Sequence, residues 1–439
     1  MSRVVAIPKK PMRALFVSNH FPTILATNTQ GIYQRMGMFI DAIKEIAQLD
    51  VLFFVSPDID TSEAAIAQLE TEFSQHWAIP IKLFLCATPA ASVSKIKQQW
   101  SGMMNFHSQT DYVGTSSLQV VQAFEACLDR QPDVVLIHRL TSICPAMLTK
   151  QPLPPVFFDL DDIEHIKFMR QIRQPPTRLR TLLYFLQIPA RWWGELQAIR
   201  LTHQTFVCSE HDRRYLQNRW GLSNVIAIPN AIAIPKPQSI TSQPTLLLLG
   251  GYYYYPNINA ANFLIEQVFP LIRQVIPQAH LIIAGTKPET IRGYGENLPG
   301  IEFTGFVDDL DALYQRSRVV CCPIFSGGGT RVKMIEAAAY GKPIVATRIG
   351  AEGLELMNGQ DFLMRDRPQE FADACIELLK NDEECDRLGA AARVAAIQHY
   401  DRSAIIQQIQ KQIQTPLTLK DTQKIPHHLT KDRDDAYAG

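Results

Sequence analysis

Short apolar segments alternate with amphipathic segments of helical spacing along most of this chain. Short, nearly continuous apolar runs are typical of buried parallel strands, and strands that alternate with helical patterns indicate βαβ units. The pattern therefore predicts an α/β fold of doubly wound parallel sheets. The strands expected in the first half are residues 14–18, 51–55, 81–85, 134–137, 156–159, 205–208 and 225–228.

The second half of the chain repeats this alternation after a segment rich in Pro, Ser, Thr and Gln. Because a chain of 439 residues exceeds the usual size of one domain, two are expected. We assign residues 1–235 and 245–400 to two Rossmann-like domains and residues 236–244 to the linker. Residues 401–414 form a last helix, and residues 415–439 form a polar tail that we expect to be disordered.

One loop carries the most specific chemistry. An apolar run leads into Phe-Ser-Gly-Gly-Gly-Thr-Arg at 325–331, and a helical pattern follows as far as Gly341. The first amides of a helix lack internal partners and lie at the positive end of its dipole, so a glycine turn there can bind phosphate. Arg331 and Lys333 add two cations beside a diphosphate, and Glu336 could accept hydrogen bonds from ribose. The alternative is an ordinary tight turn whose charges face solvent.

The run SGGGTRVKMIEAAAYGKPIVAT, followed by GAEGL at 350–354, resembles the donor site of the retaining glycosyltransferases of family 4. Weaker matches occur in the family's order, among them FDLDDIE at 158–164, VCSE at 207–210 and IPN at 228–230. The resemblance covers about residues 12–414 and points to a subgroup of bacterial sugar transferases in exopolysaccharide assembly. It implies the GT-B fold, in which two Rossmann-like domains face across a cleft and the last helix returns to the first domain.

The resemblance also implies a nucleoside-diphosphate sugar as donor substrate, with no separate cofactor and no metal. Glycines and polar residues of both domains would hold the donor, while a histidine at the end of a first-domain strand and two cations would serve catalysis. The implied donor-binding residues are Gly31, Gly251, Gly327, Gly328, Gly329, Thr330, Glu336 and Glu352, and the implied catalytic residues are His138, Arg331 and Lys333.

Two positions depart from the wider family. The family has two glutamates separated by seven residues; Glu336 matches the second, but Gly328 stands at the first, as it does in the resembling subgroup. Many relatives also place an Arg and a Lys after the strand that opens the second domain, where this chain has Gly250 and Gly251. We infer that the two cations of the glycine turn neutralise the diphosphate instead.

Other polar residues have two interpretations. His20 ends the first strand and competes with His138 for a role in the cleft, although either histidine could be structural. Asp159, Asp161 and Asp162 could bind a metal ion. They could as well contact the acceptor, and one of the last two could cap the helix that follows.

Composition narrows the setting of the protein. Its 43 basic residues balance 43 acidic ones, which gives no indication of nucleic-acid binding. Eight cysteines without metal-ligand spacing are interpreted as buried apolar residues, and no apolar run reaches the ~18 residues of a membrane span. We expect a cytoplasmic protein, peripheral at the inner face of the membrane if the basic, aromatic segment 170–200 binds there. That segment could equally form ordinary helices with solvated arginines.

The sequence thus predicts a retaining glycosyltransferase that moves a sugar from a nucleoside-diphosphate donor to a saccharide or lipid-linked acceptor. Stabilisation of the departing diphosphate would carry most of the catalysis. The setting would be polysaccharide or glycolipid assembly. Two alternatives stay open: a non-catalytic protein of the same fold in a polysaccharide machine, which the two departures favour, and a nucleotide-sugar epimerase.

Overall fold

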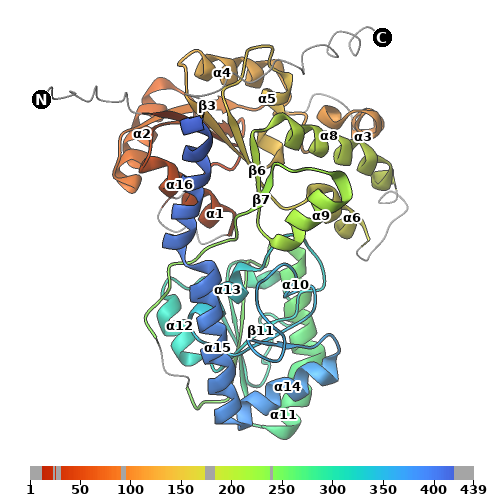
Figure 1. Ribbon diagram of the computed structural model, residues 1–439. Helices are drawn as coiled ribbons and strands as arrows, with labels where there is room; N and C mark the ends of the chain where they lie inside the picture. The colour runs from red at the N-terminus through yellow and green to blue at the C-terminus, as the bar shows by residue number, and fades with distance from the viewer. Residues whose placement is uncertain are drawn as a thin grey trace, which may run out of the picture.

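The computed structural model describes residues 12–22, 25, 31–89, 95–173, 183–237 and 241–419. These residues form two α/β domains, drawn one above the other in Figure 1. Both central sheets consist of parallel strands only, which confirms the predicted fold class of two doubly wound domains. All eight cysteines are buried free thiols, as their apolar surroundings indicated.

The first domain is built on a seven-stranded sheet of order β3-β2-β1-β4-β5-β6-β7. Apolar clusters cover both faces of this sheet, which is why its strands are continuous apolar runs rather than alternating ones. The strands are β1 Arg13–Ser18, β2 Gln48–Val55, β3 Ile81–Ala87, β4 Val134–His138, β5 Val156–Asp161, β6 Gln204–Val207 and β7 Val225–Ala227. The helices are α1 Gly31–Lys44, α2 Glu63–Trp77, α3 Lys95–Met104, α4 Leu118–Leu128, α5 Cys144–Leu148, α6 Glu164–Ile172, α8 Ile188–Leu201 and α9 Glu210–Trp220.

The second domain has a six-stranded sheet of order β10-β9-β8-β11-β12-β13 around a single large core. Its strands are β8 Thr245–Leu249, β9 His280–Ala284, β10 Ile301–Gly305, β11 Val319–Cys322, β12 Ile344–Ala346 and β13 Leu363–Met364. Its helices are α10 Tyr255–Phe263, α11 Phe269–Val275, α12 Leu310–Arg316, α13 Val332–Ala339, α14 Pro368–Lys380 and α15 Asp382–Tyr400, and a π-helical segment, Leu264–Val268, joins α10 to α11.

Each sheet contains one topological switch point, where the strand order reverses. In the first sheet β1 lies between β2 and β4, and the strand ends meet where Ser18 pairs with His138. In the second sheet β8 lies between β9 and β11, so the loops after Leu249 and Cys322 leave the same edge on diverging paths. Loops that diverge at the carboxyl ends of parallel strands leave a crevice, and such crevices bind ligands in this class of fold.

The last helix, α16 Arg402–Leu419, packs against the first domain although the chain has just left the second (Figure 1). Its residues Ile405, Ile409 and Ile413 belong to the first domain's core. The Arg402 guanidinium binds the Asp41 carboxylate of α1 at 2.7 Å. The helix ends at Leu419, so five residues that we expected in a disordered tail are helical; residues 420–439 lie outside the described residues.

The basic segment 170–200 is not one exposed charged face. Arg191 is buried, pairs with Asp111 at 2.7 Å and lies 3.9 Å from the ring centre of Phe168, so its charge is used inside the domain. Arg200 is exposed, whereas residues 178 and 180 lie outside the described part of the chain. Arg191 therefore neither contributes to a membrane-binding basic surface nor is solvated, so both interpretations of the segment 170–200 are wrong at this residue. Among the described residues, no helix has the length and apolar character of a membrane span.

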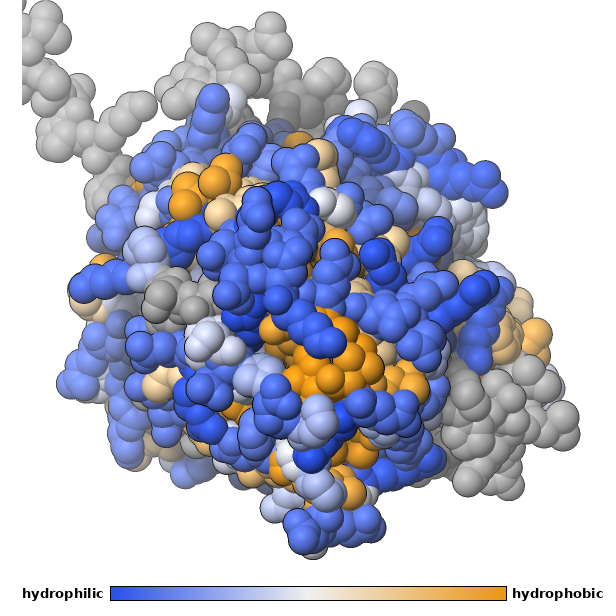
Figure 2. Space-filling model, turned by 90° about the horizontal axis from the view of Figure 1, so that it is seen from below, coloured by the Kyte–Doolittle hydropathy of each residue, from blue (hydrophilic) through white to orange (hydrophobic). Residues whose placement is uncertain are grey.

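The molecular surface at the second-domain end is largely hydrophilic. Figure 2 views the molecule from this end and shows a group of hydrophobic residues near the middle of a mostly hydrophilic face. Exposed apolar residues of the second domain include Val275 on α11 and Val394 and Ile397 on α15.

Replacement of Ile409 by Ala should destabilise the first domain. The side chain is fully buried, and truncation of a buried Ile to Ala typically costs about 2–5 kcal/mol because it leaves a cavity. Thermal unfolding followed by circular dichroism measures the change. Val394→Ala is the matched control, because Val394 is 64% exposed on the neighbouring α15 and should shift the transition little. Equal melting of the two variants would contradict the packing of α16 described above.

Candidate active site

The glycine turn, residues 327–330, links β11 to α13 under tight steric constraints. Gly327 and Gly329 have φ values of +116° and +63°, a region that favours glycine. A Cβ on Gly329 would lie 1.9 Å from Asp162 Oδ1 of the first domain, and a Cβ on Gly328 would lie 3.1 Å from the Lys167 side chain. The turn therefore needs glycine both for its backbone conformation and for its close contact with the first domain.

A cavity of about 360 Å³ lies at the second-domain switch point, and we call it the glycine-rich cavity. Its walls come from the loop after β8, the loop after β10, the start of α13 and the first residue of α1. Six residues singled out from the sequence line it together: Gly31, Gly251, Thr330, Arg331, Lys333 and Glu336. Residues from both domains thus meet in one cavity.

Lys333 is the cation nearest to the loop that follows β8. Its Nζ donates to Asn257 Oδ1 at 2.7 Å and would lie 3.2 Å from a Cβ on Gly250. Burial lowers the pKa of Lys333, with nearby Arg331 acting in the same direction. The ammonium therefore stands beside Gly250, and it has no carboxylate partner among the ion pairs of the described residues.

Arg331 precedes the first residue of α13 and folds back on its own loop. Its Nη1 donates to the carbonyl oxygens of Gly328 and Gly329, whereas its buried Nε has no partner within the described residues. Thr330 lies beside it, and its hydroxyl accepts a hydrogen bond from Asn230 of the first domain at 2.9 Å. The guanidinium thus retains unused hydrogen-bonding capacity, and Arg331 lines the glycine-rich cavity.

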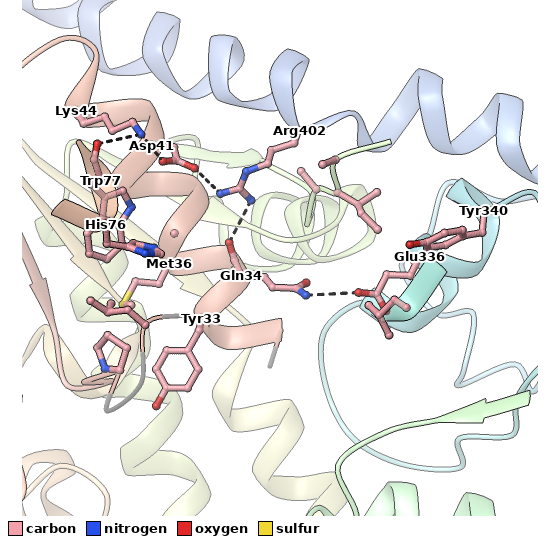
Figure 3. Close-up of a pocket in the computed structure, with 17 residues that line it drawn as sticks. Tyr33, Gln34, Met36, Asp41, Lys44, His76, Trp77, Glu336, Tyr340 and Arg402 are labelled. Carbon is pink, nitrogen blue, oxygen red and sulfur yellow. Dashed lines mark hydrogen bonds and ion pairs between the residues drawn. The ribbon is translucent and has the colours of Figure 1, made fainter. Parts of the chain in front are cut away.

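Glu336 is a nearly buried carboxylate in the wall of the glycine-rich cavity. Gln34 of α1 donates to its Oε1 across the domain boundary at 3.4 Å (Figure 3). Burial raises the pKa of Glu336 to about 7, although Gln34 and Lys333 act in the opposite direction. Glu336 also lines a second cavity, of about 480 Å³, which Figure 3 shows between α1, Tyr340 and the Arg402–Asp41 pair. A carboxylate with this position can accept hydrogen bonds from a ligand in either space.

His138 and Asp159 form part of a buried network that sequence reasoning recognised only in part. The His138 Nδ1 lies 2.9 Å from Asp159 Oδ2, and Arg35 of α1 donates to both oxygens of Asp159 at 2.6–3.1 Å. All three side chains are fully buried. Asp159 is therefore a structural partner of Arg35 and His138, and it is not free to bind a metal or an acceptor.

Asp161 and Asp162 lie with Cys208 in a group whose ligand atoms fall within 4.8 Å of one another. Arg139 pairs with both carboxylates at 3.2–3.3 Å, and Lys167 pairs with Asp162 at 3.2 Å. Burial, with Asp162 nearby, raises the pKa of Asp161 to about 7. Since basic side chains already compensate these carboxylates, the group has little negative charge left for a cation.

Neither Asp161 nor Asp162 caps the helix that follows, so that expectation is wrong. α6 begins at Glu164 and has no side-chain hydrogen bond from its N-cap residue, Ile163. Instead, the Glu195 carboxylate of α8 accepts from the backbone N–H groups of Glu164 and His165 at 2.7 and 3.4 Å. A carboxylate from another helix thus satisfies the free amides.

Glu352 is placed differently from the other predicted donor residues. Its carboxylate pairs with Arg170 of α6 at 2.6 Å, and Arg170 also donates to the Gly327 carbonyl at 3.0 Å. Glu352 lines a small cavity of about 30 Å³ together with Gly328 and Gly329. The structure therefore separates Glu352 from the glycine-rich cavity and gives it a role in holding the two domains together.

Sequence reasoning missed Arg35, Gln34, Asn230 and Arg170, which all connect the domains or the network around His138. Asn230 ends the sequence match IPN at 228–230, and Arg35 also had a signal in the sequence. It is spaced four residues from Phe39 and eight from Ile43, so it falls on the apolar stripe of α1, where a charge must find a buried partner. The others occupy polar positions that no periodicity distinguishes from solvated ones.

Part of the chain is similar to a known protein family. Residues 243–381 match the family described as Glycosyl transferases group 1. A phosphatidyl-myo-inositol mannosyltransferase of Mycobacterium leprae is 28% identical over 222 residues, which are 46% of this chain and 58% of that protein. The chain therefore spans little more than half the length of this curated relative.

Two solved structures share the fold at low sequence identity. Sucrose-phosphate synthase from Thermosynechococcus elongatus has a TM-score of 0.67 at 16% identity, covering 93% of this chain and 100% of that one. Anabaena HepE in complex with UDP and glucose has a TM-score of 0.58 at 15% identity, covering 92% and 100%. The chain thus has the two-domain GT-B fold, and residues 243–381 of its second domain are similar to glycosyl transferases of group 1.

Proposed function

We propose that this protein is a retaining glycosyltransferase that uses a nucleoside-diphosphate sugar. The observation that carries the proposal is the glycine-rich cavity, where Thr330, two cations and a buried carboxylate meet at a switch point. Gly327, Gly328 and Gly329 do not line this cavity, and they shape the turn that leads into it. The similarity to mannosyltransferases and to a protein solved with UDP and glucose supports the same class of donor. The acceptor is a saccharide or a lipid-linked saccharide, in polysaccharide or glycolipid assembly.

Different residues of this cavity would contact the diphosphate, the ribose and the base of the donor. Lys333 and the free Nε of Arg331 meet the diphosphate, together with the positive end of α1 at Gly31. Glu336 accepts hydrogen bonds from the ribose hydroxyls. Phe306 and Val307, in the loop after β10, offer an apolar surface for the base. We propose that the sugar extends from this cavity toward the first-domain switch point, where the buried His138 lies.

Catalysis on this arrangement rests on charge stabilisation. As the anomeric C–O bond to the diphosphate breaks, negative charge grows on the leaving oxygen beside Lys333 and Arg331, which stabilise it more than they stabilise the bound substrate. The acceptor oxygen forms its bond to the same face of the anomeric carbon, and its proton passes to the leaving diphosphate. Anomeric configuration is thereby retained.

We place the protein in the cytoplasm, peripheral at the inner face of the membrane. The first domain presents exposed Trp100 and Met104 on α3 and exposed Trp193 on α8, and these two helices pack together. Such side chains suit the boundary between headgroups and acyl chains, where a lipid-linked acceptor would lie. We propose this apolar surface in place of the basic segment 170–200, because Arg191 of that segment is buried.

A panel of UDP-, GDP- and ADP-sugars tests the function directly. The correct donor should raise the melting temperature, because a ligand that binds only the native state stabilises it by mass action. With an acceptor extract the same donor should release its nucleoside diphosphate. Donor binding without any turnover would support the non-catalytic alternative, and formation of a free isomeric sugar nucleotide without acceptor would support an epimerase.

Lys333→Ala and Arg331→Ala should each lower turnover by roughly 10²–10³-fold, the usual effect of removing one group that stabilises transition-state charge. Initial rates of diphosphate release measure this. Arg316→Ala is the matched control, since Arg316 is an exposed arginine of the same domain paired with Glu302. Near-normal turnover in both cavity variants would show that the diphosphate is held elsewhere.

Glu336→Gln should change how stability depends on pH. The native pKa of about 7 lies above the usual value of 4.5, so the native state keeps a proton that the unfolded chain releases. The resulting stabilisation is complete below pH 4.5 and is lost as the pH rises to about 7. Relative to the Glu336→Gln variant, the free energy of unfolding of the wild type should therefore fall by up to about 3 kcal/mol between pH 5 and pH 8.

Denaturant unfolding at both pH values tests this expectation. Glu377→Gln on the exposed face of α14 is the control, because it removes a carboxylate that is not buried. A pH dependence that is the same for wild type and both variants would contradict burial of an ionisable Glu336.

Transfer should persist in EDTA, because the cations of the glycine-rich cavity supply the positive charge that a divalent metal provides in other transferases. Initial rates of transfer are measured with EDTA, without EDTA, and after Mg²⁺ is added back. These rates show whether transfer depends on a divalent metal. Complete loss that Mg²⁺ restores would contradict the proposal and direct attention to Asp161 and Asp162.

A further inference from the structure

The network at the first-domain switch point has a defined hydrogen-bonding direction. Arg35 can only donate, and it donates to both oxygens of Asp159. Burial alone would raise the pKa of Asp159, but Arg35 and His138 together lower it, so this carboxylate is ionised. An ionised carboxylate only accepts, and the hydrogen between Asp159 and His138 therefore lies on His138 Nδ1.

The other imidazole nitrogen of His138 is then left as an acceptor. Burial lowers the pKa of His138, and Asp159 opposes this without reversing it, so the ring is neutral at pH 7. A neutral ring with hydrogen on Nδ1 has a lone pair on Nε2. That atom is buried and has no partner among the described residues.

A second unpartnered imidazole lies beside it. His20 follows β1, and its ring centre is 5.9 Å from that of His138, edge to face. Its buried Nδ1 also has no partner within the described part of the chain, and burial, with Arg139 nearby, lowers its pKa to about 2. Unpartnered buried polar atoms are rare, and two neighbouring ones at a switch point indicate a place for a hydrogen-bonding ligand group.

We propose that Arg35 and Asp159 are positioning residues that fix His138 as the neutral Nδ1–H form, so that its Nε2 accepts a hydrogen bond from a substrate hydroxyl. The proposal rests on the proposed function, because the hydroxyl belongs to the transferred sugar or to its acceptor. It explains why a buried arginine sits on the apolar stripe of α1. Without Arg35, the Asp159 charge would be buried with a neutral histidine alone.

Asp159→Asn offers a specific test. The substitution keeps the shape of the side chain but reverses the direction of its hydrogen bond to His138. Arg35 requires an oxygen, so the Asn amide oxygen faces Arg35 and its NH₂ group faces His138. An NH₂ group donates, and His138 must then accept at Nδ1 and carry its hydrogen on Nε2. The substitution therefore changes the imidazole tautomer rather than removing the contact.

Nitrogen NMR of the full chain labelled with ¹⁵N-histidine reads the tautomer without any substrate. His138→Gln identifies the His138 signals by their loss. The wild type should show a protonated Nδ1 and a bare Nε2, and Asp159→Asn should show the reverse. A wild-type His138 that is doubly protonated, or that carries its hydrogen on Nε2, would overturn the proposal even if Asp159→Asn does not fold.

The second test measures turnover with the sugar nucleotide that the thermal-shift panel identifies as the donor. Asp159→Asn should lower kcat about tenfold, the effect of losing one oriented hydrogen bond, and should have no further effect in a His138→Gln background. Equal losses in both backgrounds would mean that Asp159 acts through general stability, which would overturn the positioning role. Asp50→Asn is the matched control. Asp50 pairs with Arg130 at 2.8 Å in the same domain and lies near the amino end of β2, away from the carboxyl ends of the strands.

The two arms separate the two hypotheses. If no donor is turned over but the predicted tautomer is observed, the proposed function fails and the arrangement of Arg35, Asp159 and His138 stands. If turnover is found but the tautomer is the opposite one, the function stands and the positioning proposal fails.

Discussion

The close approach of the two domains at the glycine turn is the constraint on which the rest of the site depends. Any side chain at Gly329 would collide with the Asp162 carboxylate, and Gly328 lies against Lys167. Arg170 of the first domain holds the same turn in place, because it donates a hydrogen bond to the Gly327 carbonyl and pairs with the Glu352 carboxylate. Because the turn is held from both domains, the start of α13 and its charged residues are fixed relative to the first-domain strand ends.

The close approach of the two domains also determines which buried ionisable groups have partners of opposite charge. The buried carboxylates Asp159, Asp161 and Asp162 each face an arginine or lysine of the first domain, whereas Lys333 and Glu336 are left with neutral partners. A buried charge without an opposite partner is costly unless a ligand supplies one. The ionisable groups without an ion-pair partner among the described residues therefore lie in the glycine-rich cavity and not in the acidic group, as the proposed donor, with its diphosphate and ribose, would require.

Several parts of this molecule could be predicted from the sequence because they depend on local physics. Apolar runs define buried parallel strands, and the three glycines before α13 define a tight turn, since both follow from backbone geometry within a few residues. The grouping of Gly31, Gly251, Thr330, Arg331, Lys333 and Glu336 depended also on resemblance to a known family, and the structure brings these residues to one cavity.

Only the tertiary structure decided which polar residues are partners. Glu352 looked like a donor contact until Arg170 was found against it, and Asp159 looked like a metal ligand until Arg35 and His138 were found on either side. Arg35 and Asp159 are 124 residues apart, and Gln34 and Glu336 are 302 apart. Nothing in the local pattern specifies such pairs, because hydrogen bonds act over a few ångströms and the sequence does not state which distant segments come that close.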